Sequence, residues 1–442
     1  MTAVVAPFPQ ARSRRKAQPR NWIELAAFAA SVFLILTYSQ GWVSLLSGGA
    51  EQSPESALIR TLYLPAYGMA VGLLALRPLE SVGGLVRQPL LLLVLGIAWA
   101  SLFWSVAPDQ TSRRIFALVF TTLSGVVLAT RYDWPKLAEA MATAFAILAV
   151  VSLFVCLFVP SVGRMQTLFP GAWCGLWAEK NAFGDNQALG ASIASAAAML
   201  NPRRRKLWWG VTALCVFLVL MSTSKTSLVA VMLAAGATGL VWTVRRGPAA
   251  GVAATWAALV GVGLVASIAL FASHILFGLL GKDATLTGRT QIWSAVMRQI
   301  QARPWEGYGY AAIWDETDRW GPLAWIIHDA GFRPHHAHNS WLEQWLSLGL
   351  PGLIAWAGFY LQTLIANVFA IYTRAGAYLA LPFFVIYSLT TLTESIAVVY
   401  NDMRWVIFVA LAVRLALPDA KTAPAATAAQ AARRNQPRQK SQ

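Results

Sequence analysis

Runs of about 20 apolar residues recur along the whole chain, and no other feature limits its possible folds as strongly. A helix of roughly 20 apolar residues spans the hydrocarbon core of a bilayer, whereas an open sheet facing lipid would leave backbone polar groups unsatisfied. Of the 442 residues, 57% are hydrophobic and 12% are charged, with a mean hydropathy of +0.54. Soluble domains carry about 25% charged residues. The sequence therefore predicts an all-α polytopic membrane protein.

Hydropathy predicts about twelve transmembrane helices, with a large outer loop at about 276–340 before the tenth. The transmembrane domain is expected to cover 21–418, between a basic segment at 1–20 and a tail at 419–442 rich in Ala, Gln and Arg. Such a tail is expected to be disordered. The expected spans are 21–39, 58–76, 88–106, 113–130, 137–160, 181–200, 207–221, 226–244, 252–275, 350–372, 376–393 and 403–418.

The net charge of +16 is explained mainly by topology. If the spans alternate, 22 of the 35 Lys and Arg residues fall in polar segments on one face, together with both termini. The positive-inside rule places that face in the cytoplasm, so nucleic acid is not an expected partner. The first apolar run follows a basic segment but has no small-residue cleavage site, which predicts an uncleaved anchor. The three cysteines, Cys156, Cys174 and Cys215, fit neither a disulfide framework nor a metal site.

Three of the five histidines stand together in the stretch "RPHHAHNSWLEQWLSLGLPGL". The residues after His338 alternate with helical spacing, which predicts a short helix at the outer membrane boundary. Gly349 is expected to end this helix and Pro351 to begin the next span. His338 then lies at a helix N-terminus, where the helix dipole disfavours imidazolium. A neutral imidazole can accept a proton, so His338 is a candidate general base.

Two metal-binding interpretations were considered beside this one. The spacing of His335, His336 and His338 does not match the usual zinc patterns, and the first two are expected to be solvated loop histidines. The acidic run "DETD", residues 315–318, is typical of metal-dependent nucleotide-sugar transferases, but such donors are cytoplasmic and this segment is expected outside. We therefore predict no metal ion and no cofactor.

His338-Asn339, followed after nine residues by Gly349-x-x-Gly352, resembles the signature of the O-antigen ligase and polymerase superfamily. Three weaker segments agree in order. "GRTQIW" is similar to the Gly-Arg-x-x-x-Trp segment that opens the family's outer loop, and "WAEKNAFG" to the Lys-Asn-x-x-Gly element of its exopolysaccharide polymerases. "STSKTSLVA" resembles an element that usually has Arg at the position of Lys225, and lysine lacks the forked contact of arginine.

The resemblance implies a fold similar to the GT-C class and glycosyl transfer at the outer face of a bacterial cytoplasmic membrane. The donor would be an oligosaccharide linked to undecaprenyl diphosphate, and arginines rather than a metal would stabilise the departing diphosphate. The site residues implied are His338 and Arg289 as catalytic, Lys180, Lys225, Arg164 and Arg404 as diphosphate-binding, and Asn339 and Glu343 as orienting or acceptor-binding. Trp305, Tyr308, Tyr310 and Trp314 are candidate platforms for sugar stacking.

The acceptor separates the possible functions within the family. A polymerase extends another lipid-linked repeat unit, a ligase transfers to a lipid A core, and an oligosaccharyltransferase transfers to protein. The Lys-Asn-x-x-Gly element and the basic tail favour the polymerase, with polysaccharide export and chain-length proteins as expected partners. A transporter or flippase is the alternative from another class.

Overall fold

The computed structural model describes residues 22–46, 57–166, 169–271, 288–314 and 318–419. Side chains at 262 and 264–271 are excepted. The predicted N-terminal segment 1–20, nearly all of the tail, the first part of the outer loop and most of the "DETD" run lie outside the described residues. Within these ranges the only β pairing is a single bridge between Arg164 and Trp173.

The remaining ordered structure of the described ranges is helical. The helices are α1 (Trp22–Tyr38), α2 (Gly41–Leu46), α3 (Ala57–Leu62), α4 (Leu64–Leu76), α5 (Pro78–Val86), α6 (Pro89–Ala100), α7 (Pro108–Arg131), α8 (Trp134–Phe158), α9 (Pro160–Gly163), α10 (Lys180–Leu200), α11 (Arg205–Ser222), α12 (Lys225–Val244), α13 (Pro248–Phe271), α15 (Arg289–Ala302), α16 (Pro322–Ala330), α17 (Ser340–Thr373), α18 (Ala377–Thr391) and α19 (Met403–Ala416).

A helix lies at each of the predicted spans, and the all-α polytopic class is confirmed. By length and composition, six of the described helices are able to cross a membrane, or seven if α5 and α6, bent by 86°, form one span. Three further apolar helical segments are shorter, and they belong to α1, α13 and α18. The total of about twelve spans therefore stays a prediction.

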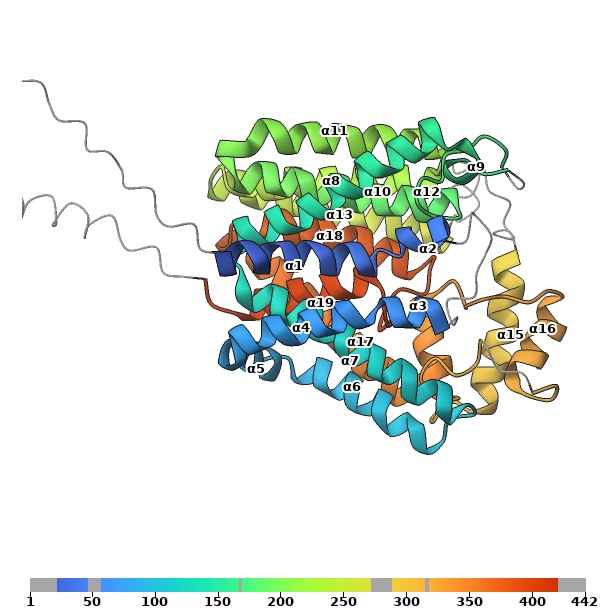
Figure 1. Ribbon diagram of the computed structural model, residues 1–442. Helices are drawn as coiled ribbons and strands as arrows, with labels where there is room; N and C mark the ends of the chain where they lie inside the picture. Colours follow the sequence, from blue (N-terminus) through green and yellow to red (C-terminus); the bar gives the residue numbers. More distant parts are fainter. Residues whose placement is uncertain (1–21, 47–56, 167–168, 272–287, 315–317, 420–442) are drawn as a thin grey trace, which may run out of the picture.

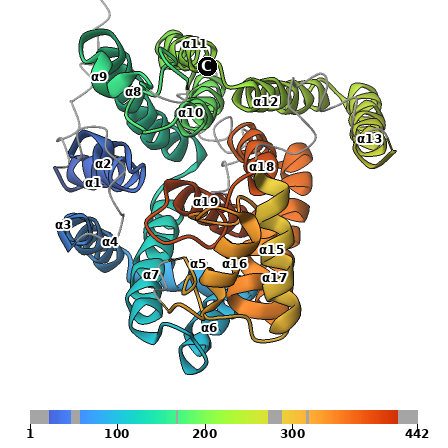
Figure 2. The same ribbon diagram turned by 90° about the vertical axis from the view of Figure 1, so that its right-hand side faces the viewer.

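Most long helices run along a common axis, and α15 and α16 lie across one end of this bundle (Figure 1). Viewed from that end, α19 is surrounded by α7, α17 and α18, while α13 lies at the periphery beside α12 (Figure 2). Trp356 of α17 and Trp405 of α19 are fully buried, with ring centroids 6.0 Å apart. At Gly125 of α7 an added Cβ would lie 2.6 Å from the carbonyl oxygen of Val406, so the α7–α19 contact requires glycine.

The helices α15 and α16 have a small apolar core of their own. Ile292 and Val296 of α15 pack with Leu323 and Ile326 of α16, and Leu346 of α17 joins them. The described part of the predicted outer loop is therefore a folded cap at one end of the bundle, attached to α17.

The opposite end of the bundle is where α1 begins and α19 ends (Figure 1), and arginine ion pairs lie there. Arg77 and Arg131 lie 3.9 Å and 3.1 Å from the carboxylate of Glu24. Arg414 lies 2.9 Å from Asp419. The histidine motif and the basic segments thus lie at opposite ends, as the charge-based topology requires.

The orientation in the membrane is testable with two exposed positions at the two ends. Ala302→Cys, at the end of α15, should react with a membrane-impermeant maleimide in intact cells, and Arg203→Cys, between α10 and α11, only after lysis. The wild-type chain is the control, because its three cysteines are buried. Labelling of position 203 but not 302 in intact cells would place the histidine motif in the cytoplasm.

Candidate active site

The fixed residues of the histidine motif each have a structural role at the start of α17. The Asn339 side chain caps the helix, accepting hydrogen bonds from the backbone N–H of Trp341 (2.9 Å) and Leu342 (3.2 Å). Helical geometry is interrupted at Gly349, with φ 67° and ψ −170°, at the residue predicted to end the short helix. An added Cβ at Gly349 would lie 2.0 Å from the Trp305 carbonyl oxygen. Asn339 is thus a capping residue, and its predicted role toward an acceptor stays a prediction.

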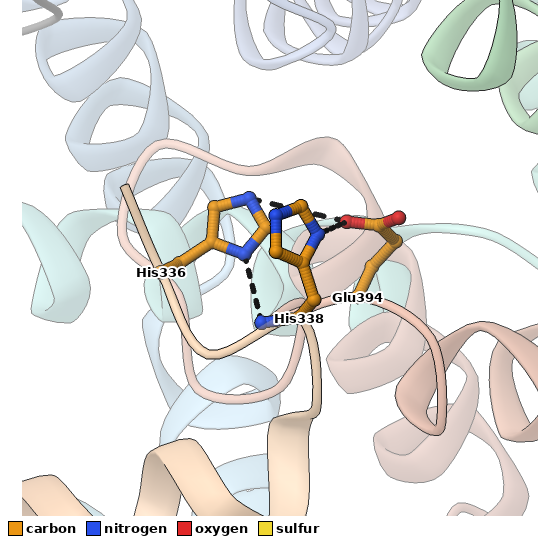
Figure 3. A group of neighbouring side chains, drawn as sticks. All are labelled: His336, His338 and Glu394. Atoms are coloured by element: carbon orange, nitrogen blue, oxygen red, sulfur yellow. Dashed lines mark hydrogen bonds and ion pairs between the residues drawn. The ribbon is translucent and has the colours of Figure 1, made fainter. Parts of the chain in front are cut away.

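His338 lies immediately before this cap, in the left-handed backbone region at φ 49°. Its Nδ1 is 3.0 Å from the carboxylate of Glu394, which lies between α18 and α19 (Figure 3). Partial burial disfavours ionisation of Glu394, but the hydrogen bond from His338 and the nearby positive charges, including Arg289, outweigh it and lower the Glu394 pKa to about 2. Glu394 is therefore ionised at neutral pH.

Glu394 is not among the site residues predicted from the sequence. The signal available was its position: an acidic residue in a short polar segment between two apolar runs, on the expected outer side. The pairing with His338 needed the fold, because the two residues lie 56 positions apart.

The expectation that His336 is a solvated loop histidine is wrong. Its ring centroid lies 3.9 Å from that of His338, and its Nδ1 accepts the backbone N–H of His338 at 3.1 Å. Its Nε2 lies 3.9 Å from Glu394. Burial, followed by the neighbouring charge of His338, lowers the pKa of His336 to about 3, so the ring is neutral at neutral pH. His335 is exposed, as predicted.

The "GRTQIW" segment forms the first turns of α15, and this helical conformation accounts for the spacing of its Arg and Trp residues. Arg289 and Trp293 are four residues apart and therefore share one helix face. Arg289 donates to Glu394 at 2.7 Å, on the oxygen not used by His338. The Trp293 indole N–H donates to the Ala337 carbonyl at 2.9 Å, next to His338. This face of α15 thus contacts both the histidine and its carboxylate partner.

Glu343 is buried one turn into α17 and holds the histidine loop in place. Its carboxylate accepts from the Trp314 indole N–H (2.5 Å), the Ala337 backbone N–H (2.9 Å) and the Ser395 hydroxyl (2.9 Å). These donors come from the outer loop, the residue before His338 and the residue after Glu394. Glu343 therefore orients the site through backbone segments rather than by touching the histidine ring.

The two remaining family elements pack against each other at the starts of α10 and α12. The Ser224 hydroxyl donates to the Asn181 side chain at 3.1 Å, and the Ser227 hydroxyl donates to Asp185 at 2.7 Å. An added Cβ at Gly184 would lie 2.5 Å from the Ser227 hydroxyl, which explains why this position requires glycine. Lys180 and Lys225, each the first residue of its helix, are thereby brought to the same end of this helix pair.

The predicted diphosphate-binding cations differ in their surroundings. Lys225 is exposed, and the Lys180 ammonium lies 3.6 Å from the centroid of the Phe169 ring. Arg164 donates to the Cys156 carbonyl at 3.0 Å, so it braces the turn after α8. Arg164 is thus the predicted cation with the clearest structural role.

Arg404 forms a forked pair with Asp402, with contacts of 3.1 Å and 2.5 Å. Asp402 also caps α19. Arg404 interacts electrostatically with Glu394 and with Asp185 of α10, and Asp185 in turn with Arg289. Two arginines and three carboxylates therefore interact with one another at this end of the bundle, and Glu394 connects them to His338.

Two of the four aromatic residues proposed for sugar stacking are buried, which makes that prediction wrong for them. Tyr308 and Tyr310 are 5% and 3% exposed. Trp314 donates to Glu343, whereas Trp305 is 66% exposed.

Helical spans, together with a histidine hydrogen-bonded to an ionised carboxylate beside two arginines, define a polytopic membrane protein with a charged site at one end of its bundle. Residues 210–357 match the family model described as O-Antigen ligase. This match includes the histidine motif, "GRTQIW" and "STSKTSLVA", and it supports the resemblance of this chain to the O-antigen ligase and polymerase family.

A curated relative agrees with the family match. The chain is 30% identical over 273 residues to the exopolysaccharide production protein ExoQ of Rhizobium meliloti (strain 1021). The matched region covers 58% of this chain and 60% of that protein. The chain is therefore similar to a protein of polysaccharide synthesis over somewhat less than two thirds of the relative's length.

Glu343→Gln should lower the stability of the folded protein around the site. The new amide N–H₂ would face either the Trp314 indole N–H or the Ala337 and Ser395 donors, and a buried unsatisfied donor costs about 1–3 kcal/mol. We expect a lower midpoint of thermal unfolding in detergent, monitored by tryptophan fluorescence. Glu306→Gln, at an exposed position of the same cap, is the control and should leave the midpoint unchanged. Equal midpoints for both variants would contradict the role given to Glu343.

Proposed function

We propose that this protein polymerises undecaprenyl-diphosphate-linked oligosaccharide repeat units at the outer face of the bacterial cytoplasmic membrane, in exopolysaccharide or O-antigen synthesis. The observation that carries this proposal is the His338–Glu394 pair, held within a cluster of arginines at the end of the bundle away from the basic segments. The family match and the relative named for exopolysaccharide production support it.

The hydrogen bond to Glu394 fixes which nitrogen of His338 acts as the base. An ionised carboxylate only accepts hydrogen bonds, so Nδ1 of His338 carries the ring proton. In the neutral ring the lone pair then lies on Nε2. Nε2 takes the proton of an acceptor sugar hydroxyl, the hydroxyl oxygen bonds to C1 of the donor sugar, and the C1–oxygen bond to the diphosphate breaks. Glu394 stabilises the imidazolium that forms, as the acidic member of a catalytic triad does.

The bonding electrons leave with undecaprenyl diphosphate, whose growing charge needs neutralisation. Arg289 uses one guanidinium nitrogen for Glu394 and keeps other N–H donors for a phosphate oxygen. Arg404, Lys180 and Lys225 add positive charge at the same end. Neither the proton transfer nor the departure of the diphosphate then requires a divalent ion.

Transfer to a lipid A core, as by an O-antigen ligase, and transfer to protein are the alternatives within the family. Both use the same donor chemistry, so the site geometry serves all three. The name of the relative favours the polymerase. A transporter or flippase would need charged groups along a path through the bundle, whereas the ion pairs described above lie at its two ends.

The direct test is incubation of purified protein with lipid-linked repeat units, followed by size analysis of the glycans. A ladder of lengths supports the polymerase. Transfer only to an added lipid A core or peptide would replace polymerisation by ligation or protein glycosylation. Movement of intact lipid-linked units across a vesicle membrane without a new glycosidic bond would replace the enzyme by a transporter.

His338→Gln should reduce the rate of chain extension by about 10²–10⁴-fold, the usual contribution of a general base. Gln keeps a polar side chain of similar size but cannot take up the proton. The matched control is His335→Gln, at an exposed histidine three positions away, which should retain most of the activity. Near-normal extension by His338→Gln, at equal protein level in the membrane, would contradict the mechanism.

Arg289→Lys should also lower the rate strongly although the charge is kept. A lysine ammonium at this place can contact Glu394 or a phosphate oxygen, but it cannot span both as a planar guanidinium can. Lys225→Arg is the opposite test and should be tolerated, because the family usually has arginine there. Full activity of Arg289→Lys would remove Arg289 from the site. The readout for both variants is the initial rate of chain extension.

A further inference from the structure

The histidine site brings three metal-ligating groups together that the proposed reaction does not use as such. One ligand atom from each of His336, His338 and Glu394 lies within 4.8 Å of the other two. Among the described residues, no other group of three His, Cys, Asp or Glu side chains has that geometry. It differs from the three-histidine set considered from sequence, because exposed His335 is replaced by Glu394.

The atoms converge in the manner of an open zinc site. Nδ1 of His338 and Nε2 of His336 lie 3.0 Å and 3.9 Å from the same oxygen of Glu394. Zinc binds nitrogen and carboxylate oxygen at about 2.0–2.2 Å, so tetrahedral ligands lie roughly 3.3 Å apart. The two separations from Glu394 bracket this spacing, and the two histidine nitrogens lie within 4.8 Å of each other. Two histidines and one glutamate, with a fourth position open, form a donor set that zinc uses in enzymes.

Two neighbouring contacts act on these ligands. The backbone N–H of His338 donates to Nδ1 of His336 at 3.1 Å, so in the neutral ring the proton lies on Nε2, the nitrogen 3.9 Å from Glu394. Binding of a metal at Nε2 therefore displaces that proton to Nδ1 and breaks the hydrogen bond that Nδ1 accepts. Arg289 bonds the other oxygen of Glu394 at 2.7 Å, so the oxygen facing the histidines stays available. The positive charges of Arg289 and Arg404 oppose a divalent cation, which favours reversible binding of added metal over a permanently held ion.

We propose that zinc, or a divalent transition metal of similar ligand preference, binds reversibly to His336, His338 and Glu394 and inhibits the enzyme. Metal on Nδ1 of His338 moves the ring proton to Nε2, the nitrogen that must accept the proton of the acceptor hydroxyl. The base is thereby blocked without any change in fold. The binding step stands on the geometry alone, whereas the inhibition rests on the proposed function.

Binding is tested first, by calorimetric titration of ZnCl₂ into the full-length protein in detergent after removal of any affinity tag. The wild-type protein should take up one zinc ion saturably, and MgCl₂ should give no such signal, because magnesium prefers oxygen ligands. His336→Gln should weaken zinc binding by on the order of tenfold or more, whereas His335→Gln should bind as the wild type. Equal affinities of the two variants, or no saturable binding, would overturn the site.

Inhibition is tested separately with the chain-extension assay. Zinc should slow extension by the wild-type protein, and EDTA should restore the original rate. His336→Gln should need at least about tenfold more zinc for half inhibition, each variant being compared with its own metal-free rate. Activation by zinc, or loss of activity on treatment with EDTA alone, would overturn the inhibitory role and make the metal part of the reaction. If the protein extends no glycan at all, the polymerase proposal fails while the binding result still decides the site.

Discussion

The carboxylate of Glu394 holds the active site together because it binds a different partner on each oxygen. One oxygen accepts from Arg289 at the start of α15, and the other lies against His338 at the start of α17. The outer cap, the long kinked helix and the segment between the last two helices therefore meet at a single charged group. Half-buried charges are stable only when they are paired and hydrogen-bonded, so this arrangement also selects the positions of the elements that carry them.

Fold class and the position of His338 next to a helix start were predictable from sequence, since both depend on local patterns. Apolar runs of helical length mark spans, and Asn339 followed by Gly349 marks a helix start and a break wherever the helix lies in the bundle. The partner of His338 was not predictable in this way. Glu394 and Arg289 pair across 105 positions, and a single sequence contains no information about such a distance except through a family resemblance. His336 is only half-buried, and its contacts with His338 and Glu394 could not be read from the loop sequence alone.

The predicted cations illustrate a limit of charge counting. Five cationic site residues were implied by their place outside the membrane and by family motifs, yet the structure gives them unequal freedom. Arg164 braces a turn, Arg404 is shared with Asp402, and Lys225 extends from its helix start. Whether a positive residue near a membrane boundary is a good candidate for binding a phosphate therefore depends on how many of its N–H donors remain unused, and not on its charge alone.

The three hydrogen bonds accepted by Glu343 have a consequence for which surfaces of the cap can change in sequence. Its three donors fix the inner edge of the cap, while the outer surface of α16, including exposed Trp325, makes no contribution to these contacts. Substitutions on that outer surface should therefore leave the Glu343 contacts, and with them the position of His338, unchanged. The outer face of the cap is thus free to vary in sequence independently of the histidine loop.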